Sequence, residues 1–429
     1  MVDWLNAGVA LIDQAPIIGG TLTKYSIGSD SPGRSYLECF DHPGFIDLFG
    51  ELYREETTQQ LFGYYESLPP LPLVGAFLQR QGAHLARLMT RFPASRFYPG
   101  SRAQRLRRLD DGRIAVDLGE GHPAREVVGA SAIIAMGGRE VTDARLSGRL
   151  DLHGLVDADR LYGSDEMLSG AGLEKALVRG GELRRIVVLG GSHSAFSVAW
   201  RLLDAVGERL APGAITILHR TEPRCFYPTR ADADADSYAF VEDDVCPATQ
   251  RVNRLSGLRG DGRELWRRIH GKPGTERESR VVCRPLRAAD LVEPELIEQL
   301  RGADLVVTTF GYRSRTLPII DATGRELHCH PDPTGASVDH EGRLWLEDGG
   351  TLPNLFGIGL GTGYRPTGRM GGEPNLRLQQ NSLWLYQNDV GEVVCRAARR
   401  AAAAYRPAAT GTVRSLMLGG ALADEAVLV

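Results

Sequence analysis

The sequence predicts an α/β protein, and three observations lead to that prediction. Several short apolar runs end in glycine, as buried parallel strands do where they meet a turn; they span 127–138, 303–311 and 354–363. Helical apolar patterns stand between these runs. No apolar run approaches the roughly 18 residues of a membrane-spanning helix. A chain of 429 residues is long enough for two or three domains.

The composition is that of an ordinary globular enzyme. The net charge of −4 argues against a nucleic-acid-binding protein, and the acidic start of the chain argues against a secretory signal. Six scattered cysteines form no close pair, which disfavours a zinc site and a redox dithiol. We therefore expect a cytoplasmic enzyme with no bound metal, no membrane contact and no nucleic-acid partner.

The most informative motif is a glycine turn in mid-chain. Four apolar residues, 186–189, lead into Gly190-Gly191-Ser192-His193-Ser194-Ala195, and a helical pattern follows. A second apolar strand is expected at 214–218. Strand, glycine turn and helix in this order are typical of a dinucleotide-binding unit, in which the helix N-terminus holds a pyrophosphate. Ser192 departs from the usual second glycine, and a plain strand-to-helix turn is the alternative.

The end of the second strand favours one nicotinamide cofactor. Folds that prefer NAD usually place an acid there, but this chain has Arg220, with Arg224 nearby. A guanidinium suits a 2′-phosphate, so the pattern favours NADPH over NADH. The alternative is that both arginines are solvated surface residues.

The N-terminal region looks like half of a second such unit. Residues 7–14 read as a buried strand that ends at Asp13, as the ribose-binding second strand of a dinucleotide fold does. The first strand and its glycine-rich loop, expected upstream, are missing. Either the strand and loop precede Met1, or the protein has lost its pyrophosphate-binding loop. The alternative for Asp13 is that it is an acidic residue in an ordinary turn.

The predicted architecture is therefore two Rossmann-like dinucleotide-binding domains, with an NADPH domain inserted in a split FAD domain. We expect the first part of the FAD domain, N-terminally incomplete, at 1–183 and its second part at 321–405. The NAD(P)H-binding domain then covers 184–320, and a C-terminal tail covers 406–429.

This order of motifs resembles the flavin-dependent N-hydroxylating monooxygenases, the lysine and ornithine hydroxylase group, and their class B relatives. Gly19-Gly20-Thr21-Leu22 resembles their flavin-side loop, and 134–138 stands where they carry Ala-Thr-Gly. The 190–195 loop and His219-Arg220 are similar to their NADPH site. Similar too are the acidic and aromatic segment 240–247, the strand end 309–313 and the last strand 354–359.

The resemblance implies a mechanism and its cofactors. NADPH reduces FAD, and oxygen then passes from a flavin C4a-hydroperoxide to a small amine or another nucleophilic substrate. The implied partners are a small-molecule substrate and O₂; a homo-oligomer stays open. Two alternatives remain: a flavin-dependent reductase or dehydrogenase without oxygen insertion, and a degenerate, non-catalytic nucleotide-binding homologue.

Candidate site residues follow from the motifs and the resemblance, with no catalytic acid or base among them. Substrate contacts are expected near the flavin edge, in a segment that faces substrate in the similar hydroxylases, and after the last strand. The substrate candidates are Tyr25, Asn253, Arg254 and Arg365. The cofactor candidates are Asp13, Gly19, Gly20, Gly137, Gly138, Gly190, Gly191, Ser192, His193, Ser194, Ala195, Arg220, Gly311, Gly359 and Gly361.

Overall fold

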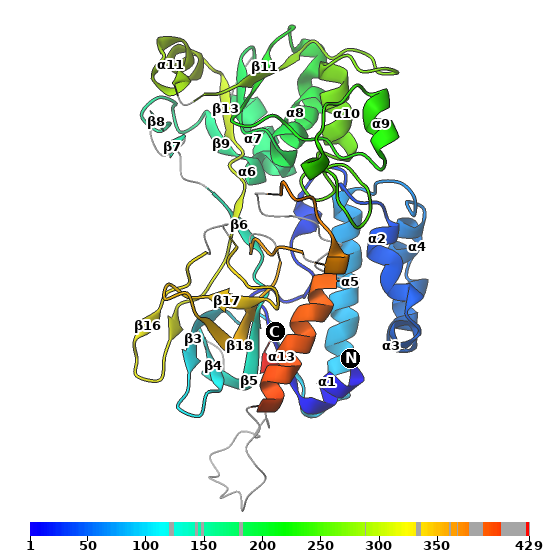
Figure 1. Cartoon of the computed structure of the whole chain (residues 1–429), viewed down its shortest axis with the longest axis vertical. Helices are drawn as coiled ribbons and strands as arrows, with labels where there is room; N and C mark the ends of the chain where they lie inside the picture. The colour runs from blue at the N-terminus through cyan, green and yellow to red at the C-terminus, as the bar shows by residue number, and fades with distance from the viewer. Residues whose placement is uncertain are drawn as a thin grey trace, which may run out of the picture.

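The computed structural model describes most of the chain and has two sheet-containing parts, one above the other in Figure 1. The described residues are 1–119, 124–141, 145–146, 150–179, 183–287, 289–331, 336–359, 362–366, 368–376, 389–404 and 426–428.

The lower part in Figure 1 is built on a sheet of ten strands. Its main path runs β16-β15-β3-β4-β5-β19-β1-β2, and β18 pairs with β5 and with β17. The strands are β1 (Val9–Ile12), β2 (Arg96–Tyr98), β3 (Ala103–Arg108), β4 (Ile114–Leu118), β5 (Glu126–Ile134), β15 (Ile319–Ile320), β16 (Glu326–Leu327), β17 (Arg343–Trp345), β18 (Thr351–Gly357) and β19 (Ala426–Leu428).

Strand β19 lies between β1 and β5 and is parallel to both. The order β2-β1-β19-β5 is that of a dinucleotide fold in which β1 is the second strand and β19 takes the place of the first. The sequence predicts a missing first strand at this place, whereas the described backbone there comes from residues 426–428.

The upper part has a five-stranded parallel sheet in the order β12-β11-β10-β13-β9. Successive residues of β10 enter different cores: Ile186 and Val188 one, Val187 and Leu189 the other. This alternation places helices on both faces of the sheet. The strands are β9 (Leu161–Gly163), β10 (Ile186–Leu189), β11 (Ile215–His219), β12 (Val281–Pro285) and β13 (Leu305–Thr308).

Helices cover both sheets. In the lower part, the N-terminal helices bury an aromatic core against β1, and the last helix packs on β5 and β18. These helices are α1 (Val2–Ala7), α2 (Arg34–Leu37), α3 (Pro43–Arg54), α4 (Glu56–Phe62), α5 (Leu71–Met89) and α13 (Gly391–Ala404). The upper helices are α6 (Ser164–Leu168), α7 (Gly170–Arg179), α8 (His193–Val206), α9 (Arg230–Ala235), α10 (Gly260–Ile269) and α11 (Pro294–Arg301).

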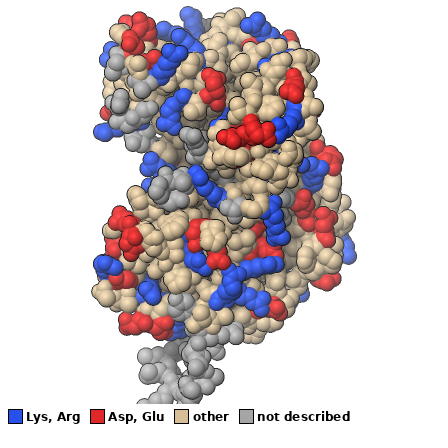
Figure 2. All heavy atoms as spheres, in the orientation of Figure 1, with Lys and Arg blue, Asp and Glu red and all other residues tan. Residues whose placement is uncertain are grey.

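Two chain crossings join the parts through a small antiparallel sheet. Strand β6 (Gly138–Glu140) leaves the lower part and pairs with β14 (Tyr312–Ser314), which returns from the upper part. A second small sheet pairs β7 (Arg145–Leu146) with β8 (Leu150–Asp151). Figure 2 shows a waist at this level, with charges of both signs above and below it.

The described helices include none that is long and apolar enough to cross a membrane.

One segment does not follow the predicted domain boundary at residue 184. Strand β9 pairs with β13, and the side chains of α6 and α7 belong to the same core as β10. Residues 161–179 therefore belong to the upper part. The three-residue sequence Leu-Tyr-Gly of β9 does not by itself indicate which sheet this strand joins.

Candidate functional site

The glycine turn after β10 lies between the ends of two neighbouring strands. A Cβ on Gly190, which has φ +139°, would stand 2.0 Å from Thr309 Oγ1. A Cβ on Gly191 would stand 2.6 Å from the Cβ of His219. Because both distances are far below van der Waals contact, only glycine fits at these two positions. The turn lies at the carboxyl end of the parallel sheet and packs tightly against the ends of the neighbouring strands.

Helix α8 begins directly after this turn. Ser192 is its N-cap residue in extended conformation, and its hydroxyl makes no capping hydrogen bond. The first amides of a helix have no partner within it, so the amides of His193 and Ser194 are available to an anion. Ala195 is fully buried against the sheet, as close helix–strand packing requires. A pyrophosphate fits this arrangement.

The two arginines that follow β11, Arg220 and Arg224, have different surroundings. Arg220 is exposed directly after the strand. Arg224 donates a hydrogen bond from Nη1 to the carbonyl oxygen of Asn375, 3.2 Å away. Of the two guanidinium groups, that of Arg220 is the more accessible to a 2′-phosphate.

The flavin-side loop lies against α5. A Cβ on Gly19 would meet the backbone of Gln79 at 2.6 Å, and a Cβ on Gly82 would meet the Ile18 carbonyl oxygen at 2.2 Å. Gly75 and Gly82, seven residues apart on one helix face, therefore let the loop approach the helix backbone. This helical glycine pair is not among the predicted site residues, although its seven-residue spacing can be read from the sequence. Gly20 has φ +73°, and its carbonyl oxygen accepts a hydrogen bond from Gln79.

Asp13 stands just beyond the carboxyl end of β1. One of its carboxylate oxygens accepts the amide of Ala15 at 2.8 Å, which fixes the carboxylate in the turn after the strand. This contact suits the alternative of a turn acid. Its place at the end of the second strand matches the prediction.

The glycine strand ends gather at the junction of the two parts. Gly137 and Gly311 have positive φ and border the pair β6–β14, and Gly138 is the first residue of β6. Gly359, with φ +101°, follows β18, which is parallel to β5. Gly361 lies outside the described residues. The described glycines thus stand where backbone could approach a flavin ring.

Tyr25 links the flavin-side segment to the upper part. Its hydroxyl donates a short hydrogen bond to Asp165, and Lys24 forms a 2.7 Å ion pair with the same carboxylate. Burial, the bond to Asp165 and nearby Tyr312 raise the pKa of Tyr25 well above its usual value. Tyr25 is therefore a neutral hydrogen-bonding group at the junction.

Asn253 and Arg254 are buried, and both donate hydrogen bonds to other residues of the chain. Asn253 has φ +46° and donates from Nδ2 to the Cys225 carbonyl oxygen and to the Tyr238 hydroxyl. Arg254 donates to the Met370 carbonyl oxygen at 2.5 Å. These contacts give both residues a positioning role in the structure, and their contact with substrate stays a prediction.

The segment 370–375 is held to the upper part by a set of hydrogen bonds. Glu373 is 3% exposed and accepts from the amides of Leu255 and Ser256 and from the Ser256 hydroxyl. The thiol of Cys246 accepts from the Gly372 amide at 3.2 Å. Burial alone would raise the pKa of Cys246, but hydrogen bonds from Thr249, Gly372 and Arg254 lower it to about 7. This segment couples the chain beyond β18 to the upper part.

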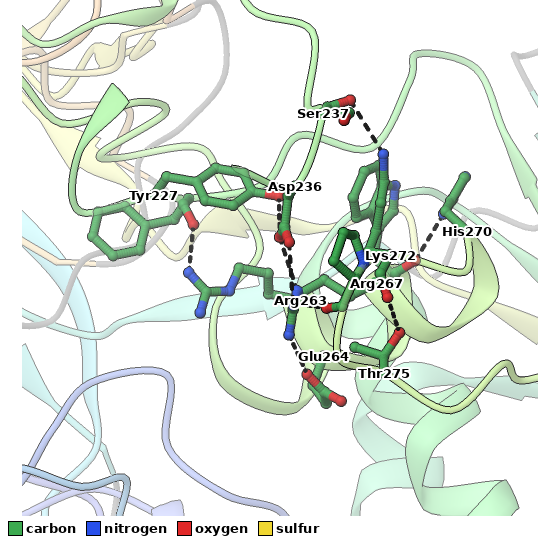
Figure 3. Close-up of polar contacts among 12 residues, drawn as sticks. Tyr227, Asp236, Ser237, Arg263, Glu264, Arg267, His270, Lys272 and Thr275 are labelled. Carbon is green, nitrogen blue, oxygen red and sulfur yellow. Dashed lines mark hydrogen bonds and ion pairs between the residues drawn. The ribbon is translucent and has the colours of Figure 1, made fainter. Parts of the chain in front are cut away.

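A polar network anchors α10, whose N-terminus lies at the junction. In Figure 3 the Asp236 carboxylate lies between Tyr227, which donates at 2.9 Å, and Arg267, which donates at 2.8 and 3.0 Å. Arg263 of the same helix donates to the Phe226 carbonyl oxygen. The network fixes the orientation of α10 and so the positions of Arg259 and Asp261 at its start.

Arg365 is exposed on the rim of a separate hollow. This cavity, about 380 Å³ in volume, is also lined by Trp345, His340 and Asp339. Within the part of the chain that the structure describes, no group of three or more His, Cys, Asp or Glu residues is placed to hold a metal ion.

Comparison with known proteins gives a consistent result. No protein-family model matches the chain. CMP-5′-(3-aminopropyl)phosphonate hydroxylase of Streptomyces rubellomurinus is 32% identical over 402 residues, which cover 92% of this chain and 91% of that protein.

Two solved structures share the fold, each with a TM-score of 0.51. The ornithine N-hydroxylase of Kutzneria sp. 744 is 15% identical, with 92% of this chain and 99% of that chain covered. The FAD-bound cadaverine monooxygenase of Erwinia amylovora is 11% identical, with 97% and 99% covered. The chain therefore belongs to the same family as CMP-5′-(3-aminopropyl)phosphonate hydroxylase, and it shares the fold of the ornithine N-hydroxylase and the cadaverine monooxygenase.

Proposed function

We propose that this protein is an FAD- and NADPH-dependent monooxygenase that hydroxylates the nitrogen of a small primary amine. The observation that carries the proposal is the turn at Gly190 and Gly191, which packs against two neighbouring strand ends and leads directly into the N-terminus of α8. The helix that follows it meets the flavin-side segment at the junction, since His193 and Gly28 line one cavity. A hydride donor held on this turn would therefore face the flavin side of the molecule.

Different residues would hold the two cofactors, NADPH and FAD. NADPH supplies a hydride, and FAD accepts it and activates O₂ when both are bound. The amides at the start of α8 bind the NADPH pyrophosphate, and Arg220 binds its 2′-phosphate. Asp13 binds the FAD ribose, and the glycines at 137, 311 and 359 admit the flavin ring. Tyr25 and Arg365 are the accessible candidates for holding the substrate.

The substrate class follows from the relatives. The hydroxylase of Streptomyces rubellomurinus is named for an aminopropylphosphonate joined to CMP, and the neighbours with the same fold are named for ornithine and cadaverine. A primary amine on a flexible carbon chain is common to the three. We therefore include nucleotide-linked amines in the proposed substrate class.

The test measures NADPH oxidation and O₂ uptake by the FAD-loaded protein, with and without a panel of such amines. We expect a productive amine to stimulate both rates. Gly190→Ala should weaken NADPH binding by at least about tenfold, the equivalent of one lost charge-assisted hydrogen bond, because the new Cβ meets Thr309. Gly213→Ala is the matched control, since Gly213 also has positive φ (+75°) but no atom lies within 4 Å of a Cβ there.

NADPH oxidation without any amine-dependent product would contradict the proposal and would favour a flavin reductase. Equal NADPH affinity in Gly190→Ala and Gly213→Ala would remove the 190–195 turn from the site.

A further inference from the structure

A small cavity, open at the exposed Asp30, lies where the start of α8, the start of α10 and segment 27–30 meet. Its volume is about 30 Å³, and its lining includes Asp30, His193, Trp200, Arg259 and Asp261. That volume is enough for one water molecule with polar partners. The cavity therefore offers a water site between the nicotinamide-side turn and the flavin-side segment.

His193, which lines this cavity, carries a ring nitrogen without a hydrogen-bond partner among the described residues. This nitrogen, Nε2, is shielded from solvent. A buried ring nitrogen without a partner is costly, so its presence calls for a ligand or a water. Burial lowers the pKa of His193, Arg259 lowers it further and Asp30 opposes both. The resting ring is therefore neutral and can accept a proton at Nε2.

The charged groups around the cavity make this proton acceptance reversible. Arg259 packs over the Phe226 ring, with its guanidinium carbon 4.0 Å from the centroid, and donates to the Arg254 carbonyl oxygen. Asp30 is exposed at the rim of the cavity. Burial raises the pKa of Asp261, the second residue of α10. Asp30 stabilises an imidazolium at His193, and Arg259 favours its return to the neutral form.

The proposed reaction needs such an acceptor. A primary ammonium group has an ordinary pKa of about 10.4, so near neutral pH nearly every substrate molecule carries the extra proton. A nitrogen can take up an oxygen atom only through its free lone pair. One proton must therefore leave the substrate before oxygen transfer.

We propose that His193 accepts this proton through a water molecule held in the cavity. The N–H bond of the substrate ammonium breaks, its electron pair stays on the amine nitrogen, and the proton passes through the water to Nε2. The imidazolium then releases the proton to solvent by way of the Asp30 carboxylate at the rim of the cavity. The inference rests on the proposed function and adds a proton-accepting residue to it.

The test is the pH dependence of coupling, which is the amount of hydroxylated amine formed per NADPH oxidised. With His193→Gln, coupling at pH 7 should fall by about 10²-fold, the lower end of general-base effects. It should recover toward the wild-type value as pH approaches the pKa of the amine itself. Ser197→Ala is the matched control, because Ser197 lines the same cavity but has no proposed role, and it should leave the pH dependence of coupling unchanged.

The outcomes separate this inference from the proposed function. A wild-type protein that hydroxylates no amine would overturn both. A His193→Gln variant with wild-type coupling at every pH, or with a loss that high pH does not relieve, would overturn only the role of His193. If that variant does not retain flavin, Asp30→Asn replaces it, and an unchanged pH profile of coupling would then overturn the inference.

Discussion

Gly190 and Gly191 occupy positions where any side chain would collide with Thr309 or His219. The colliding residues are distant in the sequence, but the pattern of strand, glycine turn and helix is local, so the turn could be predicted from the sequence alone. Arg254 differs: its partners Met370 and Cys246 lie 116 and 8 residues away along the chain. Its burial depends on long-range contacts that no local pattern reveals.

Arg220 allows a residue-scale prediction about cofactor choice. Arg220→Ala should raise the KM for NADPH by about tenfold or more, because one charge-assisted hydrogen bond to the 2′-phosphate is lost. The KM for NADH should not change. Steady-state kinetics with both cofactors measure this, with Arg209→Ala as control, since Arg209 ends the 3-10 turn that precedes β11. An unchanged preference between the cofactors would exclude Arg220 from the site.

At the scale of an element, helix α10 is an example of structure that the sequence pattern did not predict. Residues 221–300 show weak periodicity, yet they contain α9, α10, β12 and α11. The orientation of α10 depends on the Asp236 network, in which the bonded partners Asp236 and Arg267 are 31 residues apart. Pairings of this kind do not follow from hydrophobic periodicity. Helices α5 and α8 and the buried strands were easier to predict, because their apolar faces repeat regularly.

The Asp236 network predicts a pH-dependent stability. Burial raises the pKa of Asp236, but the bonds from Arg267 and Tyr227 outweigh burial and hold it below the usual value. Asp236 therefore stabilises the fold above the unfolded-state pKa of about 3.9, and this contribution is lost as pH falls through the lower folded-state pKa.

Asp236→Ala should lower the free energy of unfolding by about 1.5–3 kcal/mol at pH 7, and the difference should shrink below about pH 4. Urea titrations at several pH values measure both effects. The control is Glu264→Gln, which removes an exposed partner of the same Arg267 and should cost at most about 1 kcal/mol. A deficit that is equally large at pH 3 would show that the Asp236 charge is not its source.

At the scale of the whole molecule, two sheets meet at the junction formed by β6 and β14. The glycine ends of strands predicted the two sheets. The sequence did not predict β9 in the upper sheet or β19 between β1 and β5. Both are three-residue strands, and their neighbours in the sheets lie far away in sequence.

The central claim is that this molecule inserts an atom of O₂ into an amine. The most direct test is mass spectrometry of the product formed from NADPH, a productive amine and ¹⁸O₂. The account predicts a hydroxylamine that carries one ¹⁸O atom and is formed in proportion to NADPH oxidised. Unlabelled product, or NADPH oxidation that yields only reduced oxygen species and unchanged amine, would contradict it.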